Sequence, residues 1–92
     1  PIHINDIQPV NIDGEFWKKG DVFLSVANQS MIILYRPSTN KILWKGVGQF
    51  SLQHDVDILD NHRISVFNNR TVINFENIKN VFVQRSLVLL LS

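Results

Sequence analysis

The stretch "SVANQSMIILYRPSTNKIL", residues 25–43, is followed by a similar stretch, "SVFNNRTVINFENIKNVFV", at residues 65–83. The two align at an offset of 40 residues, at which Tyr35 also meets Phe75. The identical pairs are Ser25 and Ser65, Val26 and Val66, Asn28 and Asn68, Ile33 and Ile73, and Asn40 and Asn80. Self-similarity at a fixed period of this length is typical of repeat architectures. We therefore interpret the chain as two copies of one structural unit.

A shorter match precedes each copy. "HINDI" at residues 3–7 resembles "HDVDI" at residues 54–58, an offset of 51. The extra residues of the first copy fall within "QPVNIDGEFWKKG", residues 8–20, where the second copy has only the turn around residues 60–61. Because insertions are tolerated best in surface loops, this difference in length supports the alignment.

Short β-type runs dominate both copies, and helical periodicity is nearly absent. The runs are "DVFLSV", "MIILY", "KILW", "VDIL", "RISVF", "TVINF" and "NVFV", and turn residues separate them. We expect an all-β fold in which each copy forms a four-stranded antiparallel sheet. A four-stranded unit that repeats every ~40 residues is typical of a β-propeller blade. The first repeat would cover about residues 1–48 and the second about 49–85, and residues 86–92 are left unassigned.

Two blades do not close a propeller, since closed rings have about four to eight. We therefore expect residues 1–92 to form a single partial propeller domain, cut from a longer protein that supplies the remaining blades. The alternative is a small β-sandwich of about eight strands, which a chain of this length could also build.

Composition excludes several classes of protein. The net charge is +1 and no tract of Lys and Arg is present, so we expect no nucleic-acid partner. The longest apolar run, residues 87–91, is far shorter than the roughly 20 residues of a membrane helix, so we expect no membrane partner. The chain has no cysteine, which excludes disulfide and thiolate-metal frameworks.

His3 and His54 are the first candidates for chemistry, because they occupy the same place in the repeat. Each stands at the entrance to the first strand of its unit, and in a propeller the first strand lines the central channel. Imidazole suits nucleophilic and acid–base work near neutral pH. The alternative is that each histidine caps a strand end by hydrogen bonding to a neighbouring carbonyl.

Asp6 and Asp57 follow these histidines by three residues each. Strand alternation places His54 and Val56 on one face and Asp57 on the other, so we expect a structural role for the aspartates. No ligand spacing links His62, in the turn "DNHR", to the other histidines, and we expect no metal.

Arg70 ends "VFNNR", where a strand runs into a turn. Its forked guanidinium could bind an anionic group, although a solvated turn arginine is the alternative. We expect Trp17 and Trp44 to pack in the core or at a blade edge. Trp17 lies in the long insertion, so it could instead cover the mouth of a pocket.

The sequence "ILYRPSTNKILWKGVGQFSLQHDVDILDNHRISVFNN", residues 33–69, resembles bacterial arylsulfotransferases of the aryl-sulfate-dependent kind. The shared pattern starts with a hairpin that ends in the "KILW" strand, residues 41–44, and a Gly-containing linker. It continues with "QHD" at 53–55, a polar turn at 60–61, and a strand that ends in V-F-x-N at 66–69.

The resemblance implies a six-bladed propeller whose central channel moves a sulfuryl group from an aryl sulfate to a phenolic acceptor through a sulfohistidine. It implies that His54 and His3 are catalytic channel residues, that Arg70 binds the sulfate, and that no cofactor is needed. His54 would be the sulfuryl carrier or, if the carrier lies in another blade, a residue that stabilises charge or transfers a proton. The two-blade chain by itself would be inactive or weakly active. The partners would be aryl sulfates, phenols and the rest of the propeller, and the location the bacterial periplasm. The alternative function is a non-catalytic propeller segment that binds a ligand or a protein.

Overall fold

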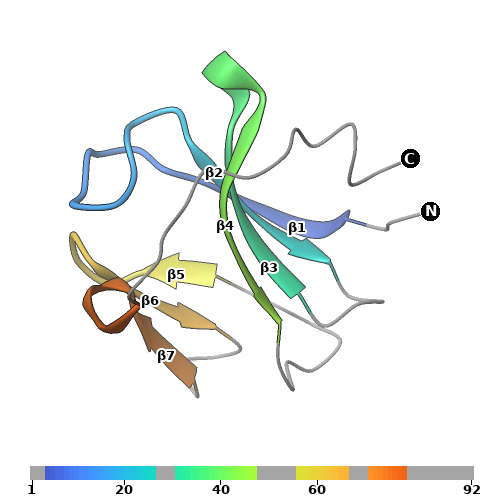
Figure 1. Ribbon diagram of the computed structural model, residues 1–92. Coiled ribbons are helices and arrows are strands. Elements are labelled where there is room, and N and C mark those ends of the chain that lie inside the picture. The colour runs from blue at the N-terminus through green and yellow to red at the C-terminus, as the bar shows by residue number, and fades with distance from the viewer. Residues whose placement is uncertain (1–3, 27–30, 48–55, 67–70, 79–92) are drawn as a thin grey trace.

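The computed structural model describes residues 4–26, 31–47, 56–66 and 71–78. Within these ranges the regular structure is two antiparallel sheets and two single-turn 3₁₀ helices (Figure 1). The all-β prediction is therefore confirmed. No helix in these ranges has the length and apolarity that crossing a membrane would require.

The first sheet has four strands in the order of the chain. They are β1 (Ile4–Pro9), β2 (Val22–Val26), β3 (Met31–Arg36) and β4 (Lys41–Val47). The second sheet contains β5 (Val56–Ile58), β6 (Arg63–Val66) and β7 (Thr71–Asn74). The 3₁₀ helices η2 (Pro37–Thr39) and η3 (Phe75–Asn77) follow β3 and β7. The run "TVINF" was predicted as a strand through Phe75, but β7 ends at Asn74 and Phe75 begins η3. The strand predicted from "NVFV", residues 80–83, lies outside the described ranges.

The first two strands of each sheet pair in corresponding registers. Asp6 of β1 stands opposite Ser25 of β2, and Asp57 of β5 stands opposite Ser65 of β6. Both serines are buried. The two aspartates thus hold the same position relative to the neighbouring strand.

The strand β3 is apolar on both of its faces. Because side chains alternate along a strand, Ile32 and Leu34 point to one side while Met31 and Ile33 point to the other. All four are buried, and they belong to two separate apolar clusters. This double burial explains why the sequence "MIIL" shows a continuous apolar run instead of alternation.

One of these clusters, which we name the shared core, contains residues from both sheets. Its fully or nearly fully buried members are Val10, Trp17, Phe23, Ile32, Leu34, Leu43, Trp44, Val56, Ile64, Val66 and Phe75. Figure 1 shows the second sheet, yellow to orange, lying beside the first. The shared core therefore joins the two sheets into one packed body.

Phe75 lies at the centre of the shared core, with none of its surface exposed. Its ring centroid is 4.7 Å from that of Trp44, 5.2 Å from Trp17, 5.8 Å from Phe16 and 6.2 Å from Phe23. The Trp17 contact is an edge-on arrangement, which aromatic quadrupoles favour. The prediction that Trp17 and Trp44 pack in the core is confirmed.

Candidate functional site

The three site residues named from the sequence, His3, His54 and Arg70, lie outside the described ranges. Their roles therefore stay predictions. The strand that follows His54 is described, and there Val56 is buried while Asp57 is exposed. The predicted alternation along this strand is correct for these two residues.

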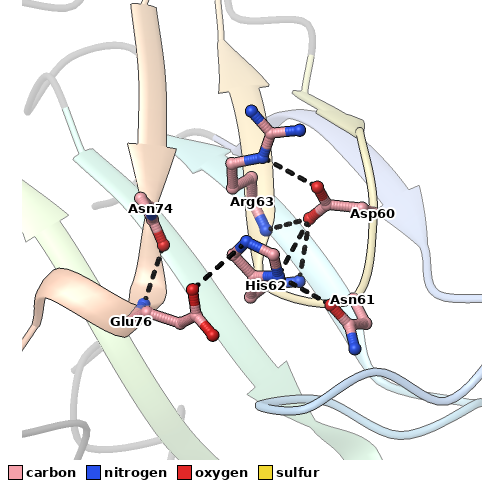
Figure 2. A network of polar contacts seen from close by, with 6 residues as sticks. All are labelled: Asp60, Asn61, His62, Arg63, Asn74 and Glu76. Carbon is pink, nitrogen blue, oxygen red and sulfur yellow. Dashed lines mark hydrogen bonds and ion pairs between the residues drawn. The ribbon is translucent and has the colours of Figure 1, made fainter.

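The turn between β5 and β6 is built around Asp60. One carboxylate oxygen accepts hydrogen bonds from the backbone N–H groups of His62, at 3.0 Å, and Arg63, at 2.8 Å (Figure 2). The other oxygen accepts from the Nε of Arg63 at 2.7 Å. The backbone hydrogen bond from His62, followed by the contacts from Arg63, lowers the pKa of Asp60 from its usual value. The turn is therefore fixed by an ionised aspartate.

His62 projects from this turn with an acceptor oxygen near each ring nitrogen. Its Nδ1 lies 2.6 Å from the side-chain oxygen of Asn61 and 3.4 Å from a carboxylate oxygen of Asp60. Its Nε2 lies 3.3 Å from a carboxylate oxygen of Glu76 (Figure 2). The His62 side chain is 24% exposed, so water and ions can reach it.

Glu76 is held in place by the 3₁₀ helix η3. The Asn74 side chain caps this helix by accepting a hydrogen bond from the Glu76 N–H at 3.0 Å. The Phe75 N–H donates to the carbonyl of His62 at 2.8 Å, which ties η3 to the β5–β6 turn.

Glu15 approaches the same turn from the insertion between β1 and β2. Its N–H donates to the carbonyl of Asn61 at 2.7 Å. One carboxylate oxygen of Glu15, one of Glu76 and one ring nitrogen of His62 all lie within 4.8 Å of one another. Three segments that are distant in the sequence thus contribute to one polar cluster, which no sequence spacing indicated.

A shallow cleft of about 300 Å³ lies next to this cluster. Its lining residues are Ile12, Asp13, Trp17, Ile58, Leu59, Asp60 and Asn61. The insertion therefore brings Trp17 both into the shared core and to the wall of a cleft. The indole N–H of Trp17 is buried and has no hydrogen-bond partner among the described residues.

A second polar contact fastens the end of the insertion to β3. Asp21 is 1% exposed, and both of its carboxylate oxygens accept hydrogen bonds from Arg36, each at 2.8 Å. The side-chain hydrogen bond to Asp21 raises the pKa of Arg36. The sequence analysis did not predict this pair. Val22 of β2 stands opposite Tyr35 of β3, so the next residues along the two strands, Asp21 and Arg36, also face each other.

Comparison with known proteins places the chain in a family. A search of the curated proteins found no match, and a search of the solved structures found none either. The family model described as "Arylsulfotransferase (ASST)" matches residues 1–91. The resemblance of residues 33–69 led to the same family. The chain belongs to the arylsulfotransferase family.

Proposed function

We propose that this chain is a two-blade portion of a propeller enzyme that transfers a sulfuryl group from an aryl sulfate to a phenolic acceptor. The observation that carries the proposal is the family match, which extends over residues 1–91. The repeat-equivalent histidines His3 and His54 add the side-chain type that the transfer requires.

The fold supports a blade-like arrangement in two ways. First, the Asp6–Ser25 and Asp57–Ser65 pairs give the two sheets a common internal register. Second, β3 is apolar and buried on both faces, so its sheet could be covered from both sides, as the sheet of an inner blade is.

In the proposed reaction, a ring nitrogen of His54 attacks the sulfur of the aryl sulfate. The bond between sulfur and the phenolic oxygen breaks, and the departing phenolate takes up a proton from water. The acceptor phenol then gives its proton to water and attacks the sulfohistidine, which breaks the N–S bond and restores the imidazole. Arg70 would neutralise the sulfate oxygens, and His3 would stabilise charge on the departing oxygen.

The test is turnover of an aryl sulfate by the full-length parent protein, with His54→Ala and His3→Ala compared against Asp57→Asn. Asp57 is exposed on β5 and serves as the matched control. If His54 carries the sulfuryl group, His54→Ala should lower kcat by about 10⁴-fold or more and abolish the protein-bound SO₃ seen by intact mass.

If His54 instead stabilises charge, the loss should be about 10²–10³-fold and the adduct should still form. Normal turnover by His54→Ala would refute the assignment of this residue. Ligand binding without any adduct in the unmodified parent would instead support the alternative, a non-catalytic binding segment.

A further inference from the structure

The cluster of Glu15, His62 and Glu76 has the donor atoms of a metal site. It offers one imidazole nitrogen and two carboxylate oxygens, all within 4.8 Å of one another. Imidazole and carboxylate together are the ligands that Zn²⁺ accepts in open sites, which keep positions for water. Glu15 and Glu76 are exposed and His62 is partly exposed, so an ion can enter.

The hydrogen bonding of His62 determines which ring nitrogen is available. Its Nδ1 faces the side-chain oxygens of Asn61 and Asp60, which are acceptors, so Nδ1 carries the proton. In the neutral ring the Nε2 lone pair then points at the Glu76 carboxylate, 3.3 Å away. Two lone pairs in this arrangement need a positive charge between them, either a proton or a metal cation.

The separation between the donor atoms of His62 and Glu76 suits a metal ion. Ligand atoms about 2.0–2.1 Å from a tetrahedral Zn²⁺ lie about 3.3 Å from each other. His62 Nε2 and the Glu76 oxygen have this separation already. In metal-binding histidines, the ring nitrogen that does not bind the metal usually donates a hydrogen bond to an oxygen atom, which orients the ring. Nδ1 of His62 has such contacts with Asn61 and Asp60.

The backbone holds the three ligands in place from three directions. Glu15 is anchored by its N–H to the carbonyl of Asn61, and η3 is anchored by the Phe75 N–H to the carbonyl of His62. Asn74 fixes the backbone of Glu76. Because these backbone contacts fix the three segments, binding would need only movements of the side chains.

We propose that Glu15, His62 and Glu76 bind one Zn²⁺ ion at the junction of the insertion, the β5–β6 turn and η3. This inference goes beyond the sulfuryl transfer proposed above and does not depend on it. The ion would link a segment of the first sheet to two segments of the second. Its role would be to cross-link the two sheets at the surface of the shared core.

The experiment is calorimetric titration of the chain with ZnCl₂ at pH 7.5 after treatment with a chelator. We expect saturable binding of one Zn²⁺ per chain. Glu15→Gln, His62→Gln and Glu76→Gln should each weaken binding by at least ~10-fold, since even outer-sphere changes cost 10–100-fold. Asp57→Asn, an exposed carboxylate on β5, should bind as the unmodified chain does.

A second measurement covers the case in which a variant does not fold. In the ¹⁵N spectrum of the unmodified chain, Zn²⁺ should shift the Nε2 signal of His62 while Nδ1 remains protonated. The proposal is overturned if the chain binds no Zn²⁺ saturably, or if binding survives all three substitutions. It is equally overturned if Zn²⁺ leaves His62 Nε2 unshifted, because a proton then occupies the place between His62 and Glu76.

Discussion

Replacing Phe75 by alanine should remove much of the stability of the chain. The side chain is fully buried and contacts four aromatic rings from the first sheet and the insertion. Truncations of buried phenylalanine to alanine cost about 3–5 kcal/mol. We expect the free energy of unfolding to fall by about 4 kcal/mol, because the lost ring contacts add to the cost of the cavity that is left.

This loss is large compared with the total free energy of unfolding of the chain. At about 0.05–0.15 kcal/mol per residue, a chain of 92 residues has roughly 5–14 kcal/mol of stability. Urea unfolding followed by circular dichroism measures the change. With a slope of about 2 kcal/mol per molar urea, the midpoint should fall by about 2 M.

Val72→Ala is the matched control, because Val72 lies on the adjoining strand β7 and is 53% exposed. It should change the free energy of unfolding by less than about 0.5 kcal/mol. Phe75→Leu, which keeps most of the volume, should lie between the two variants. If Phe75→Ala costs less than about 1 kcal/mol, or no more than Val72→Ala, the two sheets do not share the core described here.

Three further variants test local features by urea unfolding. Asp21→Asn should cost about 3 kcal/mol because it leaves Arg36 without its ion-pair partner; a loss below about 0.5 kcal/mol would show that the pair contributes little. Gly14→Ala should cost about 1–3 kcal/mol, since the added Cβ would clash with the indole nitrogen of the buried Trp17; an unchanged midpoint would contradict this close approach. Asp60→Asn should alter the pH dependence of stability. The pKa of Asp60 is lowered in the folded chain, so the stabilisation from its ionised form is complete above the unfolded pKa of about 3.9 and is lost as pH falls through the folded pKa. The difference in unfolding free energy between the native chain and Asp60→Asn should therefore shrink below about pH 4, and a difference that stays constant down to pH 2 would argue against the lowered pKa.

Sequence patterns predicted the strands well because strand patterns are local. The runs "RISVF" and "TVINF" begin where β6 and β7 begin, at Arg63 and Thr71. Alternation likewise placed Val56 and Asp57 on opposite faces, and the structure shows that the face of Val56 is the buried one.

The polar contacts between loops were not predictable in the same way. Glu15 lies in an insertion without periodicity, and its approach to His62 depends on how that insertion packs over the second sheet. A search for ligand spacing looks for ligand residues that lie close together in the sequence. The residues of this cluster are far apart in the sequence, so such a search does not find them. The Asp21–Arg36 pair is different, because a register for the β2–β3 hairpin could have placed the two residues opposite each other. The predicted site residues His3, His54 and Arg70 were named from the repeat, from the place of Arg70 at a strand end and from the family resemblance.

The position of Phe75 has a consequence for how the chain folds as it is synthesised. All four strands of the first sheet precede Phe75 in the sequence. When they leave the ribosome, the rings of Trp17 and Phe23 have no Phe75 to cover them. The nascent first sheet therefore exposes aromatic surface for the time needed to synthesise β5, β6 and β7. During this interval chaperones can bind the exposed rings, and the chain can aggregate. The interval ends when η3 docks and Phe75 covers the rings.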